Sequence, residues 1–248
     1  MKDQYVGDIG DFGKYGLLRA LCCPDGSDQR LRLGVVWYRV ENDTRTDGSK
    51  VQYLDGTEEN RRKFGNCDPD LYDRLKAIMG QGRRDLAAVE TGEVLPGDTV
   101  FFGQFLNASN RSSYITTAIS ELKQADEDRR VDVVFLDPDN GLHLGNARPG
   151  VLTKYALFSE AKQFRDLGKS LVIYQHLCRG GTHEEQTRRR LLELTRELEL
   201  DKGCEPLAIR WKTVQPRAYL IVPTMEHREL LIARARQHLL GDWQAHFG

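Results

Sequence analysis

The sequence predicts an α/β protein with a mostly parallel, doubly wound sheet, helices on both faces and a C-terminal antiparallel hairpin. Short β-branched, apolar runs alternate with longer segments of helical periodicity. The runs are apolar on both faces, as expected for strands covered by helices on each side. The last two runs, 206–213 and 217–224, are separated by three residues, which suffices for a hairpin but not for a parallel crossover.

In the first half of the chain, a helix precedes the first strand. Residues 12–23 carry apolar side chains at helical spacing, and Pro24-Asp25-Gly26 ends the segment. The run 31–40 is β-branched and aromatic, so it predicts a strand, whereas 41–57 is polar and rich in turn residues. Asp68-Pro69 predicts the N-cap and first residue of a helix. The other elements predicted here are helices near 58–65, 69–80 and 112–129 and a strand at 98–106.

In the second half, strands and helices alternate up to the hairpin. Residues 131–138 and 169–176 are strand-like, and 151–167 predicts a single helix between them. Thr182 and Glu185 have the spacing of a capping box, so a helix with a leucine stripe begins there. The chain closes with a predicted helix at 225–240.

Composition and charge limit the classes of function. The 248 residues are expected to form a single domain, 1–248. Lys plus Arg number 36 and Asp plus Glu 37, which excludes a dominant nucleic-acid-binding charge but not a local basic patch. No apolar run is long enough to predict a membrane span or a targeting segment. The five cysteines, without a CxxC, predict reduced thiols in a cytoplasmic protein.

Polar residues gather where three predicted strands end. Asp137-Pro138-Asp139-Asn140-Gly141 follows the third clear strand, and Gln175 and His176 end the fourth. The first strand is followed by Glu41, Asn42, Asp43 and, later, Asp47-Gly48. Ligands of open α/β sheets bind at the carboxyl ends of strands, so these residues predict a site. The alternative for residues 137–141 is a plain turn, since Pro, Asn and Gly all favour turns.

The N-terminal segment offers a similar choice. Gly7, Gly10, Gly13 and Gly16 recur every third residue around Asp8, Asp11 and Lys14. Such a segment can bring backbone close to a ligand at the start of a helix. The alternative is a capped surface helix on which Lys14 is exposed and contributes little to stability. Neither a P-loop nor a dinucleotide-binding fingerprint is present.

The order of these motifs resembles the large-subunit ribosomal RNA adenine methyltransferases and, more loosely, the three-Cys-motif partner proteins. Their N-terminal Gly-Asn/Asp-x-x-Asp-x-x-Lys segment is matched by Gly7-Asp8, Asp11 and Lys14. Their catalytic Asp-Pro-Pro-Tyr is matched in position by residues 137–140. The resemblance implies a class I S-adenosylmethionine-dependent methyltransferase fold, which is Rossmann-like; another doubly wound α/β fold is the alternative.

The function implied by the resemblance is methyl transfer from S-adenosylmethionine to a nucleic acid. Asp137 and the Pro138 carbonyl would accept hydrogen bonds from the target amine. The remaining catalytic candidates are Asp139, Asn140 and His176. The residues expected to border the cofactor are Asp8, Lys14, Tyr38, Asp47 and Gly48.

Two differences from that family bear on the site. The glycine-rich cofactor loop after its first strand is replaced here by YRVENDTRTDG, residues 38–48, with Gly48 as its single glycine. Asn140 stands where the family has an aromatic residue, and Tyr174 at the next strand end is the candidate substitute.

Two further classes of function stay open. Asp137 and Asp139 could bind a divalent ion such as Mg²⁺ in a nuclease or phosphoesterase. The carboxylates that would complete the shell are Asp8, Asp11, Asp43 or Asp47. A non-catalytic methyltransferase-like subunit, with a protein partner or as a homo-oligomer, is the other class.

Three consecutive arginines, 188–190, predict a solvated helix face. The alternative for them is contact with phosphate, with Arg179, Lys169 and Lys212 nearby.

Overall fold

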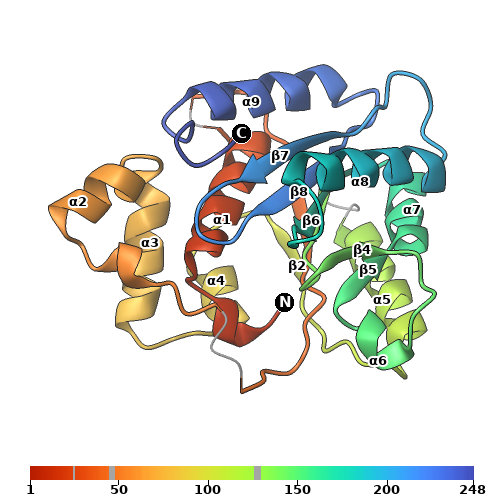
Figure 1. Cartoon of the computed structure of the whole chain (residues 1–248), viewed down its shortest axis with the longest axis horizontal. Coiled ribbons are helices and arrows are strands. Elements are labelled where there is room, and N and C mark those ends of the chain that lie inside the picture. Colours follow the sequence, from red (N-terminus) through yellow and green to blue (C-terminus); the bar gives the residue numbers. More distant parts are fainter. Residues whose placement is uncertain (25, 45–47, 126–129) are drawn as a thin grey trace.

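The computed structural model describes residues 1–24, 26–44, 48–125 and 130–248. In these residues, a six-stranded sheet has the order β2-β1-β3-β6-β8-β7, and β4 and β5 form a separate pair (Figure 1). The strands are β1 Leu33–Val36, β2 Val100–Phe102, β3 Val133–Leu136, β4 Gly141–His143, β5 Tyr155–Leu157, β6 Ser170–His176, β7 Leu207–Trp211 and β8 Arg217–Val222.

The sheet has the mixed direction that the sequence predicts. Strands β2, β1, β3 and β6 are parallel neighbours, with Val35 opposite Phe101 on one side and Phe135 on the other. Strand β8 is antiparallel to both β6 and β7, so the C-terminal hairpin forms one edge of the sheet. This arrangement confirms the predicted fold class, a Rossmann-like α/β fold.

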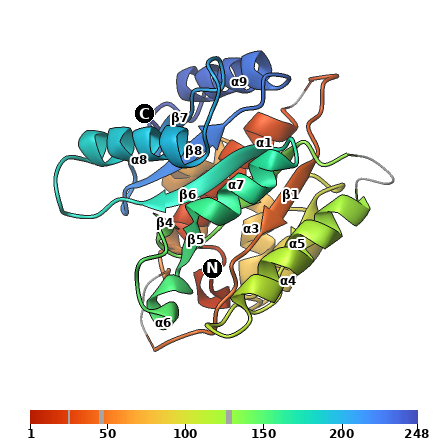
Figure 2. The same cartoon turned by 90° about the vertical axis from the view of Figure 1, so that its right-hand side faces the viewer.

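Helices cover both faces of the sheet (Figures 1 and 2). They are α1 Ile9–Cys22, α2 Glu58–Asn60, α3 Pro69–Gly80, α4 Leu86–Thr91, α5 Arg111–Ala125, α6 Pro149–Leu152, α7 Phe158–Asp166, α8 His183–Glu197 and α9 Arg228–Leu240. Buried residues of α1, α3, α4 and α9 share one apolar cluster with one face of the sheet, and those of α5, α7 and α8 share a second with the other.

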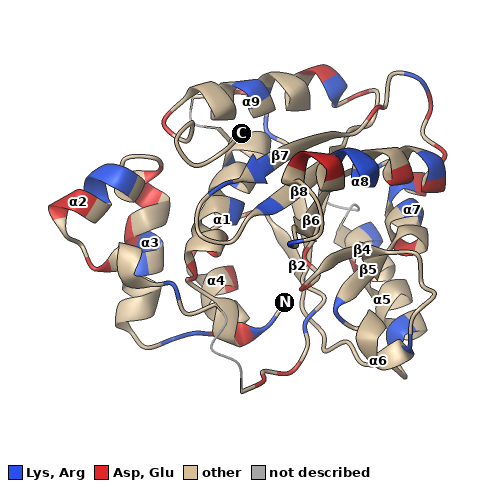
Figure 3. Cartoon of the chain, in the orientation of Figure 1, with Lys and Arg blue, Asp and Glu red and all other residues tan. Residues whose placement is uncertain are grey.

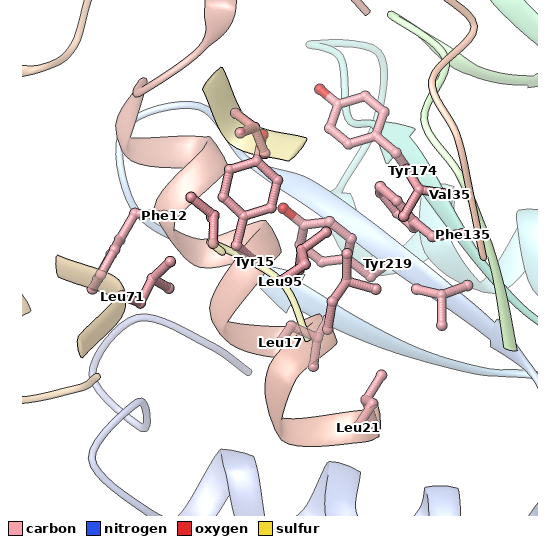
Figure 4. Packing of buried hydrophobic residues seen from close by; sticks show 14 of the residues in the cluster. Phe12, Tyr15, Leu17, Leu21, Val35, Leu71, Leu95, Phe135, Tyr174 and Tyr219 are labelled. Atoms are coloured by element: carbon pink, nitrogen blue, oxygen red, sulfur yellow. The ribbon is translucent and has the colours of Figure 1, made fainter. Parts of the chain in front are cut away.

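The strands contribute alternate residues to these two clusters. Val133 and Phe135 of β3 belong to the first, and Val134 and Leu136 belong to the second. This alternation follows from the two-residue period of a strand and explains why both of its faces are apolar. Figure 4 shows side chains of α1, including Tyr15 and Leu17, in the same cluster as Phe135 of the sheet.

Helix α1 packs close to the hairpin because small residues face it. A Cβ atom at Gly13 would lie 2.6 Å from the ring of Trp211. The glycine at this position is therefore explained by packing, and not by approach to a ligand.

The predicted single helix at 151–167 is wrong. The structure instead has α6, β5 and α7 in this range. Tyr155 to Leu157 pair with Gly141 to His143, and the backbone N–H of Leu157 donates to the Glu160 carboxylate at 2.8 Å. Glu160 thereby caps a new helix. Apolar residues at helical spacing could not reveal this short strand pair, nor could they reveal α4.

The remaining elements lie close to their predicted ranges. Asp68 caps α3, with its side chain accepting from Leu71 N–H, and Thr182 and Glu185 form the predicted capping box of α8. Of the predicted helix at 112–129, the last four residues lie outside the described part of the chain. Among the residues described, none of the helices combines the length and apolar character needed to cross a membrane.

Candidate functional site

A cavity of about 310 Å³ lies where the carboxyl ends of β3 and β6 meet the start of α1. Eight residues predicted for the site line it: Asp8, Lys14, Gly48, Asp137, Pro138, Asp139, Asn140 and His176. Asp11 and Tyr174, which the sequence also singled out, line it as well. Segments far apart in the chain are thus brought together as the strand-end argument predicts.

Lys14 lies between two carboxylates at the wall of this cavity. Its Nζ atom is 2.8 Å from Asp11 Oδ1 and 2.8 Å from Asp137 Oδ2. All three side chains are buried, and only 3% of Lys14 is exposed. The alternative of an exposed surface lysine is therefore wrong, because the helix turns this face toward the strand ends.

The local sequence explains how the three charges come together. Asp8 caps α1 by accepting from Gly10 N–H at 2.9 Å, and its other oxygen accepts from Lys50 N–H at 3.0 Å. Asp11 and Lys14 then follow at a spacing of three residues, which places them on one side of the helix. Asp137 continues β3, since its N–H donates to the Val36 carbonyl at 3.0 Å.

Burial and mutual attraction set the protonation of the cluster. Burial disfavours the charged ammonium of Lys14, but attraction by Asp11 and Asp137 outweighs it and raises the pKa of Lys14 well above its ordinary value. Burial raises the pKa of Asp11 to about 6, with Lys14 opposing the shift and Asp137 adding to it. At neutral pH the cluster thus contains a charged Lys14 ion-paired with an ionised Asp11.

The turn after β3 is real, but it does not use the Asp137 carboxylate. Gly141 has φ 115°, and a Cβ atom there would lie 2.4 Å from the Gln175 side chain. The Asp139 carboxylate instead faces the N-terminal segment, with Oδ1 2.8 Å from the Met1 amine and Oδ2 3.8 Å from Lys2 Nζ. The turn depends on its glycine, whereas both aspartates pair with cations.

Arg217 and Tyr174 also line the cavity. Arg217 is 8% exposed, its guanidinium carbon lies 5.7 Å from the Tyr174 ring centroid, and Nη2 is 4.0 Å from Asp8 Oδ1. The guanidinium occupies the space beside Gly10, where a Cβ atom would lie 1.9 Å from Nη1. Glycine is needed at this position for the arginine to reach the cavity.

Several wall residues were missed from the sequence: Lys2, Tyr5, Lys154, Gln215 and Arg217. A signal existed for Arg217. Because β8 runs antiparallel to β6, its first residue lies at the edge where β6 ends, and Arg217 is opposite His176. The predicted hairpin, combined with the strand-end rule, could therefore have identified it.

One predicted cofactor residue, Tyr38, does not line the cavity. Tyr38 is fully buried, its N–H donates to the Tyr114 hydroxyl at 2.9 Å and its own hydroxyl donates to Glu160 at 3.0 Å. Beside it, Val40 N–H donates to the Met1 carbonyl at 2.9 Å, so the N-terminal segment fills the space after β1. Asp47 lies outside the described residues.

The donor set does not favour the divalent-metal alternative. Among the described residues, no three His, Cys, Asp or Glu side chains converge as a metal site would require. The ammonium of Lys14 stands between Asp11 and Asp137, where a cation shared by these carboxylates would lie. Asp43, another carboxylate predicted for the metal shell, is ion-paired with Lys2, with Oδ2 2.7 Å from Nζ.

The fold and the cavity define a Rossmann-like α/β protein with a charged site at the carboxyl edge of its sheet. No family model matches the chain, and no curated protein matches its sequence. The function is therefore argued from the residues of the site.

Proposed function

We propose that the protein is an S-adenosylmethionine-dependent methyltransferase that acts on an amino group of a nucleic acid. The observation that carries this proposal is the ion pair of Lys14 with Asp137, 123 positions apart. The pair joins the two segments on which the resemblance to adenine methyltransferases rests. It lies at the end of a central strand and faces a cavity that also contains Tyr174.

The cost of burying the charges supports a chemical role. An isolated buried carboxylate or ammonium is strongly disfavoured, and a buried ion pair is often no more stabilising than apolar residues of the same volume. Lys14 occupies Asp137 Oδ2, while no group among the described residues donates to Oδ1. Oδ1 and the Pro138 carbonyl are therefore available to accept hydrogen bonds from an amine.

The antiparallel strand β8 between β6 and β7 also supports the proposal, because the methyltransferase fold implied by the resemblance has such a strand. Asn140 stands where the adenine methyltransferases have an aromatic residue. Tyr174 lines the cavity and can supply the missing ring. A tyrosine ring in this position can stack on an extruded base.

S-adenosylmethionine would bind in the cavity and not in the space after β1, because the N-terminal segment fills that space. The cavity volume of about 310 Å³ is at the lower end of the range for small-molecule sites. Its walls carry both positive and negative side chains, as the amino-acid part of the cofactor requires. Lys2 would hold the carboxylate of the cofactor, and Asp8 would hold its ammonium group. When bound, the cofactor supplies an electrophilic methyl group.

The protein's own residues would then act on the target amine. Asp137 accepts a hydrogen bond from the amine N–H, which holds the group in place and increases electron density on its nitrogen. Lys14 pairs with this carboxylate and fixes its orientation. Asp137 Oδ1, the oxygen not paired with Lys14, can receive the proton that the amine loses when it is methylated.

Calorimetric titration with S-adenosylmethionine and, separately, with Mg²⁺ tests the proposal, together with transfer of labelled methyl groups to unmodified RNA and DNA. We expect the wild-type protein to bind the cofactor and Asp137→Asn to reduce transfer by about 10²–10⁴-fold, the usual contribution of such a group. Asp11 still pairs with Lys14 in this variant, so we expect a loss of about 1–3 kcal/mol in unfolding free energy.

Asp73→Asn is the matched control, because this exposed aspartate lies on α3 outside the cavity. Its transfer rate should equal that of the wild type. Mg²⁺ binding with cleavage of nucleic acid would replace the proposal with the nuclease alternative. Absence of both binding and transfer would favour the non-catalytic subunit.

A further inference from the structure

A second cavity of about 240 Å³ adjoins the first. Asn140 and His176 line both cavities. The other wall residues come from the end of β6, the loop after it, α8 and β5: Tyr155, Gln175, Leu177, Cys178, Gln186, Arg189 and Arg190. Asn140 and His176 form the partition between the cavities, which is held by backbone hydrogen bonds: Asn140 N–H donates to the Lys154 carbonyl at 2.9 Å, and His176 N–H donates to the Asn140 carbonyl at 3.1 Å.

The two cavities differ in charge. Four aspartates line the first, whereas no carboxylate lines the second among the described residues. Arg190 is ion-paired with Glu193 at 2.6 Å. Arg189 is exposed and makes no hydrogen bond or ion pair with the described part of the chain. Figure 3 shows these basic residues on α8 after the acidic residues of its first turn.

The glutamines of this wall are already committed to the backbone. Gln186 accepts from Cys178 N–H at 2.9 Å and donates to the Cys178 carbonyl at 2.8 Å. Gln175 accepts from Leu142 N–H at 3.1 Å and donates to the His176 carbonyl at 2.9 Å. These contacts fix the wall, so the free guanidinium of Arg189 is the group that can bind an anion.

We infer that the second cavity binds a backbone phosphate of a single-stranded or locally opened nucleic acid, next to the nucleotide held in the first cavity, through Arg189. The identity of the strand rests on the proposed function. A guanidinium suits phosphate because it can donate two parallel hydrogen bonds. The base must leave its stack to reach Asp137, so the phosphates beside it pass the partition at Asn140 and His176.

Two of the basic residues predicted to lie near arginines 188–190, Lys169 and Lys212, lie elsewhere. Lys169 lies at the opposite end of β6, where its ammonium donates to the Val131 carbonyl at 2.8 Å, and Lys212 lies near Gln244. Neither lines the second cavity. Arg189 is the arginine of residues 188–190 that both lines the cavity and lacks a partner among the described residues.

Fluorescence anisotropy with labelled ten-nucleotide single-stranded RNA and DNA, over a series of salt concentrations, tests this inference. We expect Arg189→Ala to weaken binding of the preferred strand about 5- to 20-fold. It should also reduce the slope of log K against log salt by about 0.7, the value for one phosphate contact on a single strand. Arg189→Lys should restore the slope but not all of the affinity.

Arg236→Ala is the matched control, because it removes the same charge from an exposed position on α9, away from both cavities. Its affinity and salt slope should equal those of the wild type. An unchanged slope for Arg189→Ala would overturn the inference. So would a loss of uridine monophosphate binding without a loss of strand binding, because the cavity would then serve a free nucleotide.

The strand assay separates this inference from the proposed function. If the wild-type protein transfers no methyl group but Arg189→Ala still lowers the salt slope, the phosphate site stands and the methyltransferase proposal fails. If Asp137→Asn abolishes transfer while Arg189→Ala leaves strand binding unchanged, the reverse holds. Where both stand, Arg189→Ala should raise KM for the strand and leave kcat nearly unchanged.

Discussion

Lys14 determines whether two buried carboxylates are tolerated at the edge of the sheet. Its ammonium lies 2.8 Å from both Asp11 and Asp137. We expect Lys14→Ala to lower the free energy of unfolding by about 3–5 kcal/mol, because removing one partner of a buried pair leaves uncompensated charge. Urea denaturation at pH 8 measures this loss. The loss should be smaller at pH 5, where the unpaired Asp11 carboxyl takes up a proton because burial raises its pKa.

The control for Lys14 is Lys123→Ala, which removes an exposed lysine from the last turn of α5 and should change stability little. A neutral triple variant, Asp11→Asn with Lys14→Met and Asp137→Asn, should recover most of the stability lost by Lys14→Ala. Wild-type stability of Lys14→Ala would show that the charges are not buried as the structure has them.

At the level of the element, α1 is shaped by what its small residues admit. A Cβ atom at Gly10 would overlap the guanidinium of Arg217. We expect Gly10→Ala to displace Arg217 and to weaken S-adenosylmethionine binding about tenfold. Stability should change little, since the gain in helix propensity of up to about 1 kcal/mol offsets the displacement. Calorimetric titration and thermal unfolding of the same samples measure both effects.

Gly80→Ala, in the last turn of α3, is the control for Gly10. No atom lies within 4 Å of its added Cβ, so ligand affinity should stay at the wild-type value. Equal affinities for Gly10→Ala and the wild type would mean that Arg217 has no part in the site.

The elements that could be predicted from the sequence are those whose signal is local. Periodicity and capping residues located α3 and α8, and β-branched runs located β1, β3 and β6. Strand β5 was not predicted because three residues are too few to show a period. It is held by pairing with β4, from which residues 144–154 separate it in the sequence. Its position depends on tertiary contacts that helical spacing cannot reveal.

At the scale of the whole molecule, part of the site could be predicted because the direction and order of the strands bring certain residues to one edge of the sheet. The carboxyl ends of β3 and β6 had to meet once the strands were parallel neighbours, so Asp137 and His176 were placed correctly at one edge. The burial of Lys14 was not predictable, because the side of α1 that faces the strand ends is decided by packing against the hairpin. The sequence predicts that Tyr38 borders the cofactor, but its side chain is buried and the N-terminal segment covers the space after β1.

The C-terminal aromatic cluster joins distant parts of the chain. His238 of α9 stacks on Trp243, with ring centroids 5.3 Å apart, and contacts Phe247 at 4.7 Å. Phe247 in turn packs on Trp211 of β7. His238 is 4% exposed, and its Nε2 atom has no hydrogen-bond partner among the described residues. Burial therefore lowers the pKa of His238 to about 4.

This buried ring should make the stability of the whole fold depend on pH. Between pH 6.5 and about 4, His238 takes up a proton in the unfolded chain but not in the folded one, so stability falls as the pH falls. A pKa lowered from 6.5 to about 4 corresponds to a loss on the order of 3 kcal/mol. We expect His238→Phe, measured by urea denaturation across this range, to reduce this dependence, with His227 and His246 accounting for part of what remains because burial lowers their pKa values as well. His183→Gln, on the first turn of α8, should leave the dependence as it is in the wild type. Parallel profiles for His238→Phe and the wild type would contradict a neutral, buried His238.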